Sequence, residues 1–269
     1  MKVFLLNSWH TEGGATRAAY RLMQGLRAIG VEVLADDDRR ALAVATGRLR
    51  HALQRRIDAL PLALYRHRTR RPFSVNWFPE VTSADWTQRA DLVHLHWVGA
   101  GLLPVRALLR IKKPVLWTLH DMWPFTGGCH YDEGCGRYTD RCGACPQLRA
   151  SVENDLSRRV WSRKHTYWLS VPLTIASPSR WLADEARKSS LFANARIEVI
   201  PNGLDLSVFK PLDKRRAREA LGLPQDCRLV LFGAMAATSD PRKGYGVLLE
   251  ALNRIAATAG CIDMHLVVF

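Results

Sequence analysis

Side chains suited to binding sugar hydroxyls follow several short apolar runs of the sequence. His96 and Trp97 end one such run, His120 and Asp121 follow another, and His10 comes after the first run of the chain. Imidazoles hydrogen-bond to hydroxyl groups, and indoles offer flat apolar faces to pyranose rings. A lone histidine is more often a satisfied interior side chain, but three strands of one sheet that end in this way favour a ligand-binding crevice.

A pair of glycines, Gly13 and Gly14, precedes the first predicted helix. Glycine lets backbone N–H groups approach a ligand, and the helix dipole favours an anion there. A tight turn without a ligand is the commoner use of such a pair. Asp36 lies where a ribose-binding acid would, but the G-x-G-x-x-G pattern of dinucleotide-binding proteins is absent. The run Asp36-Asp37-Asp38 is more typical of a solvated loop than of a metal site.

Two cations, Arg242 and Lys243, lie just before another predicted helix, between Pro241 and Gly244. Cations at a helix N-terminus oppose the helix dipole, so they lower stability unless an anion lies between them. A diphosphate would be such an anion, held by both side chains and by backbone N–H groups. The alternative is a solvated basic turn.

Four of the six cysteines lie close together in the sequence, at Cys129, Cys135, Cys142 and Cys145. In a reducing compartment, clustered cysteines favour metal binding or free thiols over disulfides. The C-x2-C pair around Gly143 is typical of a zinc knuckle, whereas the C-x5-C half is looser. We expect the four side chains to converge. Three states stay open: a structural zinc site with His130 as a spare ligand, unligated thiols, and disulfides.

These residues need a scaffold, and apolar runs alternate with helix-period segments as in βαβ units around a parallel sheet. The predicted strands are Lys2–Asn7, Val31–Asp36, Leu92–His96, Val115–His120, Leu173–Ser177, Ile197–Ile200, Arg228–Phe232 and Met264–Phe269. The predicted helices are Ala15–Ile29, Trp181–Lys188 and Tyr245–Ala259. Ligands of such α/β sheets bind at the carboxyl ends of the strands, where the histidines lie.

The segment 206–226 is polar and contains Pro211 and Pro224, so we expect it to link two domains. Residues 1–205 then form a complete Rossmann-like domain, and residues 227–269 begin a second Rossmann-like domain. A doubly wound domain needs about five or six strands. We therefore expect the second domain to be incomplete and the chain as given to be inactive.

The composition is globular, with 48% hydrophobic and 24% charged residues and no apolar run long enough for a transmembrane helix. The N-terminus turns polar too soon for a signal peptide, which predicts a cytoplasmic location. The net charge is +14, and ten arginines lie between Arg39 and Arg71, with Asp58 as the only acidic residue. Charge alone does not choose between nucleic acid, a membrane surface and phosphorylated substrates.

The arginine-rich segment also carries an apolar stripe, formed by Leu49, Leu53, Ile57, Leu60 and Leu64. This spacing predicts an interfacial helix on an anionic membrane, kinked or split at Pro61. The alternative is a basic helix packed on its own domain. We expect a peripheral protein on the inner face of the plasma membrane. Nucleic acid is not expected as a partner, because the arginines lack the interleaved aromatic residues of a stacking platform.

Four motifs occur in a fixed order along the chain, and their combination indicates a family. They are Gly13-Gly14-Ala15 with Arg17, His120-Asp121-Met122-Trp123, Ile200-Pro201-Asn202-Gly203-Leu204-Asp205 with Phe209-Lys210-Pro211, and Arg242-Lys243-Gly244. In this combination the sequence closely resembles family-4 glycosyltransferases of the GT-B fold. The stretch Asp121–Leu148 looks most like the colanic-acid-type bacterial branch.

The resemblance implies retaining transfer of a hexose from a nucleotide-sugar donor to a lipid-linked or polysaccharide acceptor, in the synthesis of cell-surface polysaccharide. No cofactor or catalytic metal is implied. Catalytic roles would fall to His120, near the reacting sugar, and to Arg242 and Lys243 at the donor diphosphate. Such fixed cations would neutralise charge on the departing diphosphate.

The resemblance also implies which residues line the rest of the site. The donor side would comprise Gly13, Gly14, Arg17, Asn202, Gly203 and Gly233, with Asn202 and Gly203 at the floor of the cleft between domains. The acceptor-side candidates are His10, His96, Trp97, Asp121 and Trp123. Two departures from the family pattern stand out: Ala234 follows Gly233 where many members have arginine, and the downstream E-x7-E segment is absent.

Three rival interpretations remain. A nucleotide-sugar epimerase of GT-B shape would need acid/base carboxylates in the crevice, which here is richer in His and Trp. A basic nucleic-acid-binding protein would account for the charge. A non-catalytic fragment of an enzyme is the third.

Overall fold

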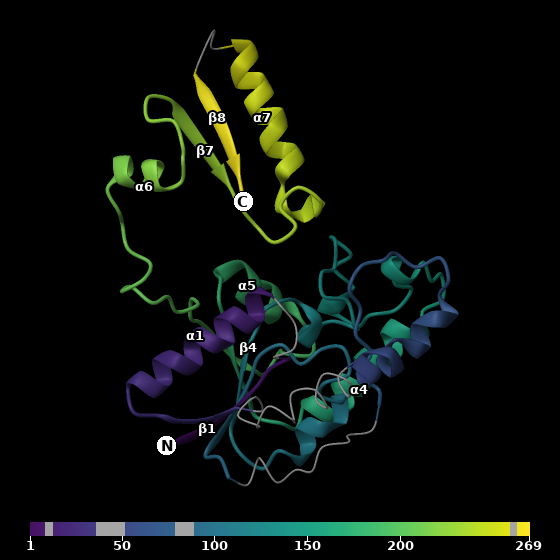
Figure 1. Cartoon of the computed structure of the whole chain (residues 1–269). Helices are drawn as coiled ribbons and strands as arrows, with labels where there is room; N and C mark the ends of the chain where they lie inside the picture. Colours follow the sequence, from purple (N-terminus) through teal and green to yellow (C-terminus); the bar gives the residue numbers. More distant parts are fainter. Residues whose placement is uncertain (9–12, 36–51, 79–88, 259–262) are drawn as a thin grey trace. The chain divides into compact units, whose positions relative to one another are not determined.

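The computed structural model describes residues 1–8, 13–35, 52–78, 89–258 and 263–269 (Figure 1). The chain divides into two compact units, Met1–Leu204 and Asp205–Phe269. His10, Asp36 to Asp38, Leu49 and the arginines from Arg39 to Arg50 lie outside the described residues.

The first unit is built on a parallel sheet of six strands. The strands are β1 (Lys2–Leu6), β2 (Glu32–Ala35), β3 (Leu92–Leu95), β4 (Val115–Thr118), β5 (Leu173–Ser177) and β6 (Arg196–Val199). Their order across the sheet is β2-β1-β3-β4-β5-β6. This confirms the predicted α/β fold with a Rossmann-like sheet, whose central strands β1, β3 and β4 are buried along most of their length.

Strand order reverses between β1 and β3. From β1 the chain passes outward to β2 and then returns to β3 on the other side of β1. In open α/β sheets, ligands bind outside the carboxyl ends of the strands at such a switch point. β3 and β4 end one or two residues earlier than predicted, so His96 and His120 lie just beyond their strands.

Three α-helices of the first unit are α1 (Gly14–Ala28), α4 (Leu156–Trp168) and α5 (Arg180–Lys188). Residues 52–59 are also helical, and the 3-10 segments are η1 (Leu60–Leu64), η2 (Val105–Arg110), η3 (Trp123–Phe125), η4 (Arg137–Thr139) and η5 (Pro146–Leu148). α1 buries Ala18, Ala19 and Met23 against β1 and β2. Ser179 caps α5 by accepting from Leu182 N.

The core of the first unit is aromatic. Trp117, Trp123 and Trp168 lie with ring centroids 5.3 to 6.1 Å apart. Phe125 packs edge-on against Tyr138 and also contacts Phe192. α4, which the sequence analysis did not predict, brings Trp168 into this core.

The second unit contains α6 (Lys214–Ala220), β7 (Arg228–Phe232), η6 (Pro241–Lys243), α7 (Tyr245–Thr258) and β8 (Met264–Val268). β7 and β8 pair in parallel. The segment 206–226 is not the plain linker that its prolines suggested, because it contains α6. Asp213 caps this helix, and Arg218 Nη1 donates to three carbonyl oxygens that follow it, those of Pro224, Gln225 and Cys227.

Candidate functional site

Hydrogen bonds join the strand ends at the switch point. Trp97 N donates to Asn7 Oδ1 at 3.1 Å, and Ser8 N donates to the Trp97 carbonyl at 3.0 Å. Asn7 Nδ2 donates to Thr16 Oγ1 at 3.3 Å, which ties the first turn of α1 to the same place. Asn7 is 2% exposed and was not among the predicted site residues, although it is the last residue of the first predicted strand. The edge is therefore held rigidly before any ligand binds.

The first turn of α1 is open to a ligand. Cβ atoms added at Gly13 and Gly14 would meet no atom of the described residues within 4 Å, so packing against those residues does not require glycine at either position. The helix has no side-chain N-cap and no acidic residue in its first turn. The first N–H groups of the helix and the exposed Arg17 therefore make the space in front of this turn electropositive.

Three histidines form a row from the core to the surface. His94 Nε2 lies 2.8 Å from Thr118 Oγ1, and His96 Nδ1 lies 2.9 Å from His120 Nε2. The rings of His94 and His96 are 4.5 Å apart, and those of His96 and His120 are 5.2 Å apart. His94 and His96 are buried, whereas His120 is partly exposed. His120 is thus the member of the row that a ligand can reach.

The row is neutral at physiological pH. Burial lowers the pKa of His94 and of His120 to about 4, and the pKa of His96 lies well below its ordinary value for the same reason. Only one proton lies between His96 Nδ1 and His120 Nε2, so Nδ1 is the ring nitrogen of His120 left for a ligand. His96 Nε2 is buried and has no hydrogen-bond partner among the described residues.

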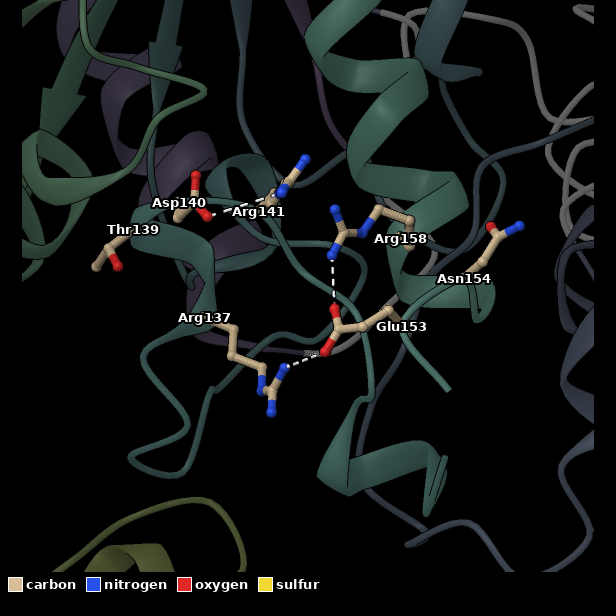
Figure 2. Close-up of a pocket in the computed structure, with 7 residues that line it drawn as sticks. All are labelled: Arg137, Thr139, Asp140, Arg141, Glu153, Asn154 and Arg158. Atoms are coloured by element: carbon tan, nitrogen blue, oxygen red, sulfur yellow. Dashed lines mark hydrogen bonds and ion pairs between the residues drawn. The ribbon is translucent and has the colours of Figure 1, made fainter. Parts of the chain in front are cut away.

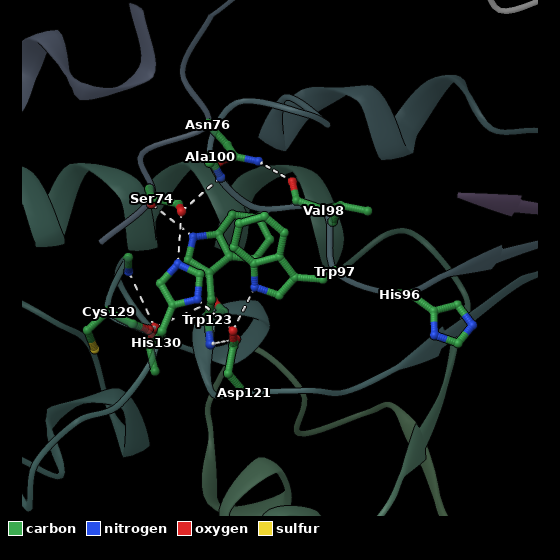
Figure 3. A network of polar contacts seen from close by, with 12 residues as sticks. Ser74, Asn76, His96, Trp97, Val98, Ala100, Asp121, Trp123, Cys129 and His130 are labelled. Atoms are coloured by element: carbon green, nitrogen blue, oxygen red, sulfur yellow. Dashed lines mark hydrogen bonds and ion pairs between the residues drawn. The ribbon is translucent and has the colours of Figure 1, made fainter. Parts of the chain in front are cut away.

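Asp121 lies in a buried network (Figure 3). His130 Nδ1 donates to Asp121 Oδ2 at 2.6 Å, and His130 Nε2 lies 2.8 Å from Ser74 Oγ. Trp97 Nε1 also donates to Asp121 Oδ2, and the Trp123 N–H donates to Oδ1. Burial by itself would raise the pKa of Asp121, but these partners hold it below its ordinary value. The carboxylate therefore links the loop after β4 to Trp97, which follows β3.

Two of the predicted acceptor-side residues need correction. Trp123 is 2% exposed and packs in the core, where its Nε1 donates to the Ser74 carbonyl at 2.9 Å. Asp121 has both oxygens engaged by protein groups. Neither side chain presents a free face to an acceptor. Trp97 remains partly exposed beside them. Sequence spacing placed all three at a strand end but could not show which way each side chain turns.

The basic turn of the second unit is partly self-neutralised. Arg242 Nε lies 2.9 and 3.1 Å from the two carboxylate oxygens of Asp240, which also caps η6. Lys243 is exposed and makes no side-chain hydrogen bond or ion pair with the described residues. Both cations lie in η6, before Gly244, and not in the first turn of α7 itself. Gly233 is enclosed, because a Cβ there would lie 2.1 Å from the Phe269 ring.

Comparison with known proteins decides the family. The model of glycosyltransferase family 4 matches residues 12–208, well over half of the chain. The chain belongs to this family. Both motifs discussed above, the glycine turn and His120 after β4, fall within the matched region. Asn202 and Gly203 also fall there and are exposed in the structure.

Curated relatives of this family member match parts of it. WcaC of Escherichia coli, assigned to colanic acid biosynthesis as a glycosyl transferase, is 30% identical over 145 residues, which is 50% of this chain and 35% of WcaC. A D-inositol 3-phosphate glycosyltransferase of Nocardioides is 40% identical over 74 residues, 28% of this chain and 16% of its own. The matched part of the chain thus spans about a third of the length of WcaC and less than a fifth of the length of the Nocardioides enzyme.

A solved structure also resembles the chain. HepE of Anabaena, in complex with UDP and glucose, aligns with the whole chain and with 60% of its own length, at 15% identity and a TM-score of 0.46.

A hollow in the first unit of this family-4 chain has a volume of about 540 Å³ (Figure 2). It is lined by Arg137, Thr139, Asp140, Arg141, Glu153, Asn154 and Arg158. Glu153 accepts from Arg137 at 2.9 Å and from Arg158 at 2.7 Å. Three arginines against two carboxylates leave a small positive charge. Arg137 lies 16 positions before Glu153 and Arg158 lies 5 positions after it, spacings that match no motif used in the sequence predictions.

The four clustered cysteines line one small cavity of about 20 Å³, together with Phe73 and Tyr138. All four are free thiols. As the side chains are placed, no three His, Cys, Asp or Glu groups in the described part of the chain form a ready-made metal-binding set. Both ring nitrogens of His130 are engaged by Asp121 and Ser74, so the idea that His130 is a spare metal ligand is wrong.

Proposed function

We propose that the protein transfers a sugar, with retention, from a nucleotide-sugar donor to a lipid-linked or polysaccharide acceptor during synthesis of bacterial cell-surface polysaccharide. The observation that carries this proposal is the histidine row at the switch point, within a family-4 sequence. A neutral, partly exposed His120 ends the row, and both it and the first turn of α1 follow strands of the same parallel sheet. The assignment of WcaC to colanic acid biosynthesis supports the class of product.

His120 would bind the sugar that is transferred. Its Nε2 is held by His96, so its Nδ1 faces the ligand space with a fixed ring orientation. If His96 carries the shared proton, Nδ1 of His120 is protonated and donates to a hydroxyl or phosphate oxygen. In the opposite tautomer, Nδ1 accepts from a sugar hydroxyl. Either arrangement works at neutral pH, because the ring does not ionise there.

Lys243 would neutralise the donor diphosphate. Transfer of the sugar leaves negative charge on the departing nucleoside diphosphate, and a positioned cation lowers the energy of that state. Arg242 is already paired with Asp240. Of the two cations of the turn, Lys243 is therefore the one whose side chain is more available to a diphosphate. Catalysis by these groups needs no metal ion.

The hydrogen bonds of Asp121 favour transfer over epimerisation. An epimerase needs a carboxylate or similar acid/base pair at the substrate. Asp121 is the carboxylate nearest to His120 in the sequence. Both of its oxygens already accept hydrogen bonds, from His130, Trp97 and Trp123.

Substitution of Lys243 by alanine tests the proposal. In the enzyme assayed with its donor, identified by thermal-shift screening of nucleotide sugars, Lys243→Ala should lower turnover by roughly 10²–10³. Release of nucleoside diphosphate is the measurement. Lys214→Ala, which removes an exposed lysine from α6, is the matched control and should leave turnover unchanged. Wild-type turnover in Lys243→Ala would show that the turn is only a solvated surface.

We also propose that the first unit binds an anionic membrane surface, where a lipid-linked acceptor would lie. Leu53, Leu60 and Leu64 are 57%, 60% and 84% exposed, and Arg55 and Arg56 are exposed on the same helix as Leu53. As predicted, the helix is broken near Pro61, where η1 begins. No helix of the described residues is long and apolar enough to cross a membrane.

Vesicle binding tests this surface. Replacing Arg48, Arg50, Arg55 and Arg56 by glutamine should abolish co-sedimentation with vesicles that contain anionic lipid, because each cation near such a surface contributes about 1 kcal/mol. Replacing Arg187, Arg196, Arg215 and Arg254, which lie on other elements, is a control of equal charge change. Unchanged sedimentation of the first variant would contradict the proposal.

A further inference from the structure

The loop region between β4 and α4 has little regular structure of its own. Residues 119–155 form only the short 3-10 segments η3, η4 and η5, yet most of the residues from Leu119 to Cys129 are buried. Disulfides or metal ions commonly add stability to irregular, cysteine-containing segments. The described cysteines of this region are free thiols.

The thiols face a cavity that suits a soft cation. Its volume of about 20 Å³ is room for one water-sized guest. A buried water needs two to four good hydrogen-bonding partners, roughly, and sulfur is a weak one. Phe73 and Tyr138 close the walls. A thiophilic metal ion fits such a lining better than water does.

Hydrogen-bond donors already point at the sulfur atoms. Gly127 N donates to Cys142 Sγ at 3.1 Å, and the N–H groups of Gln147 and Leu148 donate to Cys145. Donors directed at sulfur stabilise thiolates and are the usual outer partners of metal-bound cysteine. For protonated thiols the same donors are poorly satisfied.

The backbone is built tightly around the sulfur atoms. A Cβ at Gly127 would lie 2.6 Å from Cys142 Cβ and 2.5 Å from the Ser157 carbonyl. Gly143, inside the C-x2-C pair, has φ +157, and a Cβ there would lie 2.5 Å from the Glu153 carbonyl. Ala144 follows with φ 40, in the left-handed region that few side chains favour. This strained turn holds Cys142 and Cys145 on one side of the cavity.

A buried cation lies beside the cavity. Lys164 is 0% exposed, and its Nζ donates to the carbonyls of Trp123 and Thr126 and lies 3.8 Å from the Trp123 ring centroid. Thr126, whose carbonyl accepts from Lys164, donates through Oγ1 to the Cys129 carbonyl, and the next residue, Gly127, donates through its N–H to Cys142 Sγ, so Lys164 lies close to two of the cysteines. A lysine is rarely buried without a negative partner. Four thiolates around a divalent ion carry two net negative charges and would supply that partner.

We propose that Cys129, Cys135, Cys142 and Cys145 bind one zinc ion as thiolates, and that this ion fixes the loop region between β4 and α4. Binding forms four Zn–S bonds of about 2.3 Å and releases four thiol protons to solvent. The thiols rotate inward to reach this geometry. The ion holds the segment that carries His130, and through His130 it steadies Asp121 next to the sugar-binding histidine. Its role is structural and independent of the sugar-transfer proposal.

Metal analysis of the protein purified without added zinc is the first test. We expect about one zinc ion per chain. Cys142→Ser and Cys145→Ser should each reduce this several-fold, whereas Cys227→Ser, which alters the described free thiol of the second unit, should leave it unchanged. Equal zinc content in the Cys142→Ser and Cys227→Ser proteins would overturn the assignment.

A second test needs no variant and so does not depend on how the variants fold. Titration of the wild-type protein with a mercurial reagent should release zinc in step with modification of four thiols. After chelation, cobalt should restore the intense visible bands of a tetrahedral thiolate site. Absence of zinc before and after titration with the metal, together with four freely reactive thiols or a disulfide-bonded mass, would defeat the proposal.

Discussion

The two units bury their side chains to very different extents. In the first unit, Trp117, Phe125, Leu119 and Ile175 are 2% exposed or less, and each helix has a buried stripe. Among the described residues of the second unit, only Arg218 and Ala237 are buried, and α7 has no buried residue. Both units nevertheless form the same kinds of element. Local pattern is therefore enough to form a helix or strand, while burial depends on neighbours.

The helices α5 and α7 show this difference directly. Both were predicted from an apolar stripe, and both form within one residue of the predicted bounds. α5 buries Leu182, Ala183 and Ala186 against β5 and β6. Ile255, on the corresponding stripe of α7, is 40% exposed. We infer that mutations act on stability in the first unit far more than in the second.

Truncation of apolar side chains should give the largest contrast. Phe125→Ala is expected to lower the free energy of unfolding of the first unit by about 3–5 kcal/mol, since it empties a fully buried site. Leu231, on β7, is 64% exposed, and Leu231→Ala should change the stability of the second unit by less than about 0.5 kcal/mol. Urea-dependent hydrogen exchange, read peptide by peptide, measures both. Equal costs would mean that the second unit has a core of its own.

The sequence predicted the helices and strands better than it predicted which side chains each residue contacts. The strand ends, the turn before α1 and the position of His120 just after β4 were predicted closely, because each depends on a local pattern. The burial of Trp123 was missed, because spacing does not show on which side of a loop an indole packs. The Asp121 network was missed because Ser74 lies 47 positions earlier in the chain and belongs to no motif. α4 went unpredicted because Lys164 occupies its buried stripe, where a sequence pattern expects an apolar residue.

Acid should destabilise the first unit selectively. His94 and His120 have pKa values near 4, below their ordinary value of 6.5, because of burial. Between these values the unfolded chain binds protons that the folded chain does not, so stability is lost as pH falls from about 6.5 to 4. Asp58 opposes this, since burial raises its pKa to about 6 and its protonation favours the folded state. For His94, His120 and Asp58 together, the net loss from pH 7 to pH 5 should be about 2–3 kcal/mol. His96, whose pKa also lies well below its ordinary value, adds to this loss.

Tryptophan fluorescence reports on the first unit alone, because all nine tryptophans lie between residues 9 and 181. Urea midpoints at pH 7, 6 and 5 should fall, less so in His94→Gln and more so in Asp58→Asn. His265→Gln, on the exposed end of the second unit, should follow the wild type. A midpoint that does not change with pH would show that the row ionises freely in the folded protein.

The smallest contrast compares two aspartate N-caps. Asp155 caps α4 and is 2% exposed, and its carboxylate accepts from Arg158 N, Ser157 Oγ and Cys145 N. Asp213 caps α6 in the second unit, is exposed, and accepts only from Arg216 N among the described contacts. Asp155→Ala should cost about 2 kcal/mol, because it removes a cap and leaves buried donors without a partner. Asp213→Ala should cost less than about 1 kcal/mol, the range of an exposed cap.

Asparagine separates capping from charge in this pair. Asn is as good an N-cap as Asp, so Asp213→Asn should restore wild-type exchange rates in α6. Asp155→Asn should recover only part of the loss in α4, because its amide nitrogen cannot accept from Cys145 N in place of the second carboxylate oxygen. Full recovery in α4 would mean that the bond to Cys145 contributes nothing to stability. The strained Cys142–Cys145 turn would then be held by some other contact, and the zinc ion proposed for it would be the first candidate.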